Sequence, residues 1–211
     1  MSLLPDWNQY REQFPKRYWE FGEFDEKLKE KLSYIANRYC HHHGEEPITV
    51  LDVGGGAYGT EVLKPFVSDY GWSVDLLDPF INLKPEWMND QVGYDSTSEY
   101  DIIVCRGSIN YLSTNQLTKI ATMTKCFGVM YANTFLNPPS VNWAERETEN
   151  GAGIKGIERF RLCGDKVQHQ TVFGDCTIEH EFFFHSQETY AKIFPLVEFE
   201  SYGKNSMILY G

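Results

Sequence analysis

One stretch of the chain combines the residue types that a nucleotide-like cofactor needs. Residues 48–60 read ITVLDVGGGAYGT, in which Gly54, Gly56 and Gly59 have the G-x-G-x-x-G spacing and Gly55 stands between the first two. Glycine has no Cβ, so a turn built from it can be sharp, and a ligand can lie against bare backbone. Because glycines also cluster in ordinary turns, the triplet by itself is weak evidence for such a site.

The segments on either side supply the context that such a loop requires. The apolar run 48–53 is typical of a strand buried on both faces of a parallel sheet. Residues 61–70 predict a helix, which should be kinked or start late because Pro65 lacks an N–H. Asp78 ends the next apolar run, and a carboxylate at the tip of the second strand is where doubly wound folds hold ribose hydroxyls.

Three motifs together resemble those of class I S-adenosylmethionine-dependent methyltransferases. They are residues 51–59 (LDVGGGAYG), 76–79 (LLDP) and 100–112 (YDIIVCRGSINYL). Asp52 discriminates between families, because the first motif of these methyltransferases has an acid two residues before its first glycine, whereas nicotinamide-binding loops usually have a small or apolar residue there. The resemblance covers residues 48–130 well and the C-terminal strand pair more loosely.

The resemblance implies a cofactor, S-adenosylmethionine, and the residues that surround it. Asp52 would lie near its methionine end, the glycines of the loop beneath it, and Asp78 on its ribose. The further cofactor-binding residues that the resemblance implies are Pro79, Asp95, Cys105, Arg106 and Gly107.

The implied fold is α/β and doubly wound, with a mostly parallel sheet and an antiparallel strand pair at the C-terminal end. The sequence departs from the family pattern between 92–94, the expected third strand, and 101–105, the expected fourth. Only residues 95–100 join them, whereas a parallel crossover normally needs a dozen or more residues. Either the third strand is missing or displaced, or the crossover is an extended link without a helix.

The length of 211 residues suits one α/β domain with a full core and is too short for two domains of ordinary size. We therefore expect a single domain, 1–211, in four parts. These are an N-terminal helical cover (1–45), a cofactor-binding core (46–136), an inserted hairpin or lid (137–176) and a C-terminal strand–helix–strand segment (177–211).

Two of these parts carry clear periodicity. Apolar residues that include Leu28, Leu32 and Ile35 predict an amphipathic helix in the cover. In the insert, residues 160–162 and 166–172 predict two antiparallel strands that turn at Gly164-Asp165.

Composition excludes several other classes of protein. The formal net charge of −11 argues against a nucleic-acid substrate, since such binding draws on Lys and Arg contacts to phosphates. No run approaches a membrane span and no signal-peptide pattern opens the chain, so we expect a cytoplasmic protein. Five cysteines without a C-x-x-C pair suggest neither a disulfide framework nor a zinc site.

Methyl transfer from a sulfonium places modest demands on acid–base groups. The sulfonium carries its own leaving group, so the reaction needs mainly in-line approach and exclusion of water. A base is required only if the acceptor is protonated, and Tyr111 and His169 are the candidates for that role. His180 and His185 have opposite parity in one expected strand, which places them on opposite faces and excludes a pair.

The sequence therefore predicts an S-adenosylmethionine-dependent methyltransferase that acts on a small molecule. Three alternatives stay open. They are an NAD(P)-dependent oxidoreductase that uses the same glycine loop, a cofactor-binding protein without transferase activity, and a methyltransferase that acts on a protein or nucleic acid.

Overall fold

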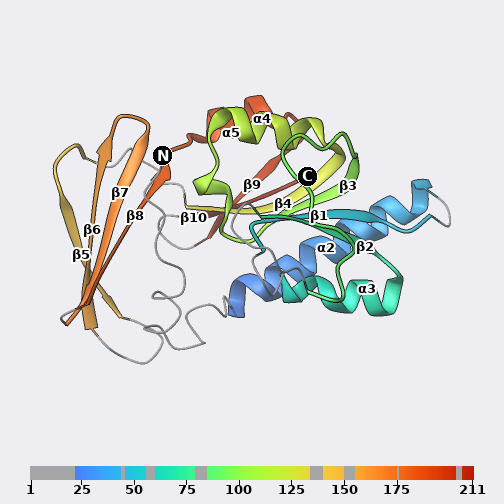
Figure 1. The fold of residues 1–211 in the computed structure, drawn as a ribbon, viewed down its shortest axis with the longest axis horizontal. Helices are drawn as coiled ribbons and strands as arrows, with labels where there is room; N and C mark the ends of the chain where they lie inside the picture. The colour runs from blue at the N-terminus through green and yellow to red at the C-terminus, as the bar shows by residue number, and fades with distance from the viewer. Residues whose placement is uncertain are drawn as a thin grey trace. The chain divides into compact units, whose positions relative to one another are not determined.

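The computed structural model describes residues 22–43, 46–55, 60–78, 85–133, 140–149, 155–174, 176–202 and 206–211. The chain forms two compact units, each built around its own sheet (Figure 1). We call them the α/β unit (Glu26–Thr134 and Ser186–Gly211) and the sheet unit (Met1–Asp25 and Phe135–His185). The expected four-part division of a single domain stays a prediction.

The α/β unit contains a six-stranded sheet in the order β2-β1-β3-β4-β10-β9. The strands from β2 to β4 run parallel, and β10 runs antiparallel to both β4 and β9. The prediction of a mostly parallel sheet with an antiparallel C-terminal pair is thus confirmed. The bounds are β1 Thr49–Val53, β2 Ser73–Leu77, β3 Tyr100–Cys105, β4 Thr124–Asn133, β9 Glu198–Tyr202 and β10 Ser206–Tyr210.

Helices cover both faces of this sheet, which explains why its central strands are apolar without alternation. Every residue of β3 is buried, and so is every residue of β1 except the first. In Figure 1, α2 and α3 lie on one face and α4 and α5 on the other. Their bounds are α2 Gly22–His43, α3 Lys64–Tyr70, α4 Thr114–Thr122 and α5 Gln187–Ile193.

The predicted helix features are confirmed in the α/β unit. Leu28, Leu32 and Ile35 form a buried stripe on α2. After the glycine loop the chain makes a 3-10 turn, η3 (Glu61–Leu63), before α3 begins with Pro65 in its first turn. A proline is tolerated there because the first N–H groups of a helix have no intrahelical partner, so the helix starts late as expected.

The third strand of the parallel sheet is reduced to one bridge, between Leu76 and Gln91. The backbone N–H groups of Asn89 and Val92 donate to the carbonyls of Val74 (2.9 Å) and Leu76 (2.8 Å). Within the described stretch 85–99 no helix intervenes before β3. The predicted short or missing third strand is therefore confirmed, because the link is too short for a helical crossover.

The sheet unit contains four antiparallel strands in chain order. The predicted pair of strands that turns at Gly164-Asp165 is confirmed as part of β6 and β7. The expectation that His180 and His185 share one strand is wrong, because the chain leaves the sheet at Phe183 and Ser186 already caps α5. The bounds are β5 Ala144–Glu149, β6 Lys155–Cys163, β7 Lys166–Phe173 and β8 Cys176–Phe183.

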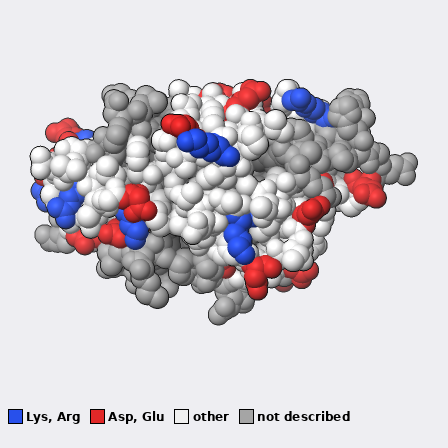
Figure 2. All heavy atoms as spheres, turned by 90° about the horizontal axis from the view of Figure 1, so that it is seen from above, with Lys and Arg blue, Asp and Glu red and all other residues white. Residues whose placement is uncertain are grey.

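Charged side chains of both signs are interspersed on the face shown in Figure 2. Of the helices in the described part of the chain, none combines the length and apolar character that crossing a bilayer demands.

Candidate functional site

A buried carboxylate joins the two ends of the glycine loop. Asp52, near the end of β1, is fully buried. Its Oδ2 accepts a hydrogen bond from the backbone N–H of Thr60 and its Oδ1 accepts one from the Thr60 hydroxyl, both at 2.7 Å. Asp52 precedes the loop and Thr60 follows it, so this pair, which we call the Asp52–Thr60 clamp, holds the loop closed at its base.

The Asp52 carboxyl holds its proton more tightly than a carboxyl in water does. Burial raises its pKa from 3.8 to about 6, and the neighbouring carboxylate of Asp78 also raises it. The hydrogen bonds from Thr60 and the charge of Arg106 act in the opposite direction. A cationic ligand close to Asp52 would favour its ionised form, because an opposite charge at short range lowers the pKa of an acid.

Two glycines of the loop give space to protein side chains. A Cβ on Gly55 would lie 2.1 Å from Oδ2 of Asp52, and a Cβ on Gly54 would lie 2.4 Å from Cβ of Ser108. Gly54 also has a φ of 74°, a conformation that residues with a Cβ rarely adopt. Glycine is therefore needed at 54 and 55 before any ligand is considered. Gly56 and Gly59 lie outside the described residues.

Hydrogen bonds align the carboxyl ends of the three strands that border the loop. The N–H of Gly54, just after β1, donates to the carbonyl of Leu77 in β2 at 2.9 Å. The hydroxyl of Ser108, beyond β3, donates to the carbonyl of Val53. The polar residues that follow β1, β2 and β3 thus share one rim, which is where parallel α/β sheets bind ligands.

Asp78 and Tyr94 lie near each other at this rim. Asp78 is buried directly after β2, and its carbonyl accepts a hydrogen bond from the side-chain amide of Gln91 at 2.8 Å. Burial, together with the nearby Cys105 and Asp78, raises the pKa of Tyr94 to about 12. Tyr94 belongs to the candidate site, although the sequence did not predict it. The only indication in the sequence was its position directly before Asp95, one of the expected cofactor-binding residues.

Asp95 is exposed in the turn that contains Tyr94, and its predicted contact with the cofactor stays a prediction. Pro79 lies outside the described residues.

The end of β3 and the two residues that follow it supply the other expected residues. Cys105 is buried, and burial together with the charge of Asp52 raises the pKa of its thiol. Arg106 is half-buried and close enough to lower the pKa of Asp52, and Gly107 turns the chain with a φ of 81°.

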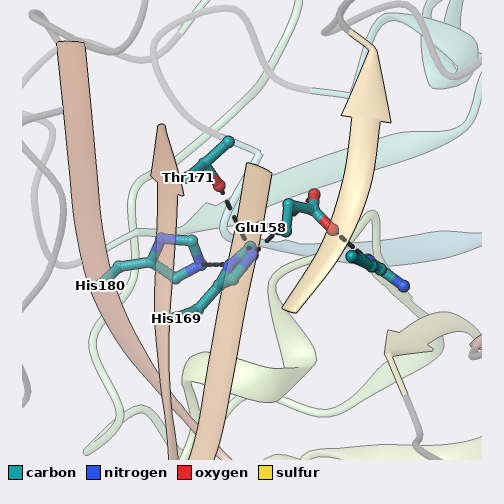
Figure 3. A network of polar contacts seen from close by, with 5 residues as sticks. Glu158, His169, Thr171 and His180 are labelled. Carbon is teal, nitrogen blue, oxygen red and sulfur yellow. Dashed lines mark hydrogen bonds and ion pairs between the residues drawn. The ribbon is translucent and has the colours of Figure 1, made fainter. Parts of the chain in front are cut away.

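The two candidate bases lie in different units. Tyr111 ends the 3-10 turn η4 (Ile109–Tyr111), which follows β3 in the α/β unit, and it is half-buried. His169 lies in β7 of the sheet unit, where its Nδ1 is 3.1 Å from Nε2 of His180 (Figure 3). This histidine pair was missed because it depends on the pairing of β7 with β8, which the sequence reasoning had assigned to separate parts of the chain.

Comparison with known proteins identifies the fold. No family model and no curated protein matches the chain. Among solved structures, it resembles an S-adenosylmethionine-dependent methyltransferase from Clostridium acetobutylicum ATCC 824, with 14% identity over 92% of this chain and 98% of that one and a TM-score of 0.55. It also resembles the PH0226 protein from Pyrococcus horikoshii OT3, with 12% identity over 96% and 97% and a TM-score of 0.56. The chain has the class I methyltransferase-like fold.

Alanine substitutions at Gly54 and Gly71 should separate crowding from backbone strain. Both glycines have a similar positive φ, but a Cβ on Gly71 would meet nothing within 4 Å. Gly71→Ala should cost about 1–2 kcal/mol of stability from the backbone alone. Gly54→Ala should cost about 1–3 kcal/mol more, because its Cβ overlaps Ser108. Urea denaturation measures both losses, and equal losses would show that Ser108 can move aside freely.

Asp52→Asn should remove a pH dependence of stability. Because the folded-state pKa is raised, the folded chain holds the proton of Asp52 more tightly than the unfolded chain does. The stabilisation from Asp52 is therefore complete below about pH 4 and is lost as the pH rises through about 6. Relative to the variant, the free energy of unfolding of the wild type should fall by up to about 3 kcal/mol across this range. A difference between the two urea denaturation curves that does not vary with pH would contradict the assignment.

Proposed function

We propose that this protein binds S-adenosylmethionine at the rim of β1, β2 and β3 and transfers its methyl group to a small molecule. The observation that carries this proposal is the Asp52–Thr60 clamp, which closes a glycine loop beside the buried acid Asp78. The class I methyltransferase-like fold supports the choice of cofactor. The charge of −11 supports a small acceptor over a nucleic acid, whose phosphates such a chain would repel.

The rim residues fit the parts of this cofactor. Asp52 would face the methionine end, where positive charges on sulfur and nitrogen favour its ionised form. The glycines 54, 55, 56 and 59 would underlie the cofactor, and Asp78 would accept hydrogen bonds from the ribose hydroxyls. The adenosine end would contact Pro79, Asp95 and the residues that end β3, Cys105, Arg106 and Gly107.

When bound, the cofactor would supply a methyl group on a sulfur that leaves as a neutral thioether. The task of the protein is then to orient the acceptor in line and to exclude water. Cys105 stays a thiol at neutral pH because its pKa is raised, so it does not compete with the acceptor as a thiolate nucleophile. Tyr111, on the segment after β3, is the proposed group for an acceptor that must lose a proton, and the same role for His169 stays a prediction from the sequence.

Calorimetric titration with S-adenosylmethionine, S-adenosylhomocysteine and NAD⁺ tests the cofactor. We expect heat with the first two. Heat with NAD⁺ alone would favour an oxidoreductase, and heat with none of them from folded protein would refute the proposal. If the protein binds the cofactor but methylates no member of a broad panel of acceptors, the result would favour a cofactor-binding protein without transferase activity.

Asp78→Ala should weaken cofactor binding by about 1–3 kcal/mol, because it removes charge-assisted hydrogen bonds to the ribose. Asp69→Ala is the matched control, since Asp69 is an exposed acid on α3. It should leave the dissociation constant unchanged. Calorimetry on the two variants provides the comparison, and equal affinities would place the ribose elsewhere.

A further inference from the structure

Each strand of the sheet unit contributes at least one polar side chain to a row across one face of the sheet (Figure 3). Nε of Arg146, in β5, donates to Oε2 of Glu158, in β6. Oε1 of Glu158 lies 3.9 Å from Nε2 of His169, in β7, and Nδ1 of His169 lies 3.1 Å from Nε2 of His180, in β8. Oγ1 of Thr171 is 3.5 Å from the same Nε2 of His169. We call these five residues the polar row.

Strand register creates the row. Arg146 stands directly opposite Glu158, and His169 stands directly opposite His180. Glu158 is opposite Thr171, which lies two positions along β7 from His169 and therefore on the same face. Residues opposite each other in antiparallel strands are side-chain neighbours, so a different register would separate these groups.

Apart from Arg146, which is exposed, the row is largely shielded from water. Glu158 and His180 are buried, and the ring of Phe182 packs near both imidazoles, with centroids 6.2 Å from His169 and 5.9 Å from His180. Burial, with the charge of Arg146, lowers the pKa of His169 to about 4. Burial, with His169 beside it, lowers the pKa of His180 to about 3. Both imidazoles are therefore neutral at pH 7, and one ring nitrogen donates to the other.

Protonation would disrupt this arrangement in two ways. An imidazolium has N–H groups on both nitrogens, so two of them cannot form the hydrogen bond that joins His169 to His180. Two imidazolium charges would also lie side by side next to the guanidinium of Arg146, at a place where the imidazoles are poorly solvated. On this face, the charged groups that the structure describes beside the imidazoles are Arg146 and Glu158. Lys166, Glu179 and Glu181 alternate to the other face of the sheet.

We propose that the polar row is a proton-operated switch, which keeps the sheet unit folded while both imidazoles are neutral and opens it when they take up protons. The inference concerns the sheet unit alone and does not depend on the proposed function. An opened chain has histidines that titrate near 6.5, so between that pH and about 4 the opened state binds more protons. The stability of the sheet unit therefore falls as the pH falls through this range.

The buried acid of the α/β unit acts with the opposite sign. Because the pKa of Asp52 is raised, its contribution to the stability of that unit grows in acid, so we expect the sheet unit to open first. Two-dimensional ¹H–¹⁵N NMR of the full chain from pH 7.5 to 3.5 follows both units at once. We expect the amides of β7 and β8 to lose their native positions in acid while those of β1 and β3 keep theirs. Native β7 and β8 amides at pH 3.5, or one shared midpoint for both units, would overturn the proposal.

His169→Gln tests the row directly, with His185→Gln as the matched control. Glutamine can still hydrogen-bond to His180 but does not titrate, so the opening midpoint should move down by about half a pH unit or more. His185 is also a buried histidine of the sheet unit, but it follows β8 and lies outside the row. The midpoint should move less in the control, because His185 does not take part in the hydrogen bond between His169 and His180. A midpoint that moves equally in both variants, or upward in His169→Gln, would overturn the proposal.

The ring nitrogen signals of His169 provide a measurement that does not rely on the folding of the His169→Gln variant. In the wild type they should report a pKa well below 6.5. Glu158→Gln should lower this pKa further and Arg146→Met should raise it, because the two variants break the same ion pair but remove opposite charges. A pKa near 6.5 in the wild type, or changes of the same sign in the two variants, would refute the electrostatic coupling that the switch requires.

Discussion

The Asp52–Thr60 clamp is the constraint on which the rest of the candidate site depends. Burying a carboxylate is costly, and the cost is reduced when its oxygens accept hydrogen bonds. Here Thr60 supplies both a backbone and a side-chain donor, so the stretch that follows the loop is held to the strand that precedes it. Gly55 is part of the same arrangement, because a Cβ there would occupy the space of the carboxylate. The two ends of the loop are thus held together by the hydrogen bonds that satisfy one buried acid.

The same physical cause acts with opposite sign in the two units. Removal from water disfavours the charged form of any group, so burial raises the pKa of Asp52 and lowers those of His169 and His180. As the pH rises through the weakly acidic range, the contribution of Asp52 to the stability of the α/β unit therefore falls, and the contribution of the two histidines to the stability of the sheet unit rises. One chain combines two buried titrating centres whose contributions to stability partly offset each other.

The shortened third strand changes the composition of the rim. With a single bridge at Gln91 and no helix in the described stretch before β3, Val92 and Tyr94 pack against the hydrophobic core from a short link. The side chain of Gln91 reaches the carbonyl of Asp78, which supports the end of β2. A tyrosine is thereby placed beside the acid proposed to hold the ribose, at a position where the expected fold would have had a strand tip and a crossover.

The sequence by itself determined the features that depend on neighbouring residues. The apolar run of β1, the glycine turn at Gly54 and the late start of α3 at Pro65 all follow from local backbone and side-chain chemistry. The short link before β3 also predicted either a missing or displaced third strand or a crossover without a helix, because chain length alone limits a crossover.

Only the tertiary structure decided which distant groups meet. It paired Gly54 with Ser108 and His169 with His180, and it brought Tyr94 close to Asp78. These contacts depend on strand order and register, which arise from the packing of the whole sheet and have no signature in a short window of sequence. The strength of the clamp and the depressed basicity of the histidines have the same origin, because burial is a property of the folded chain.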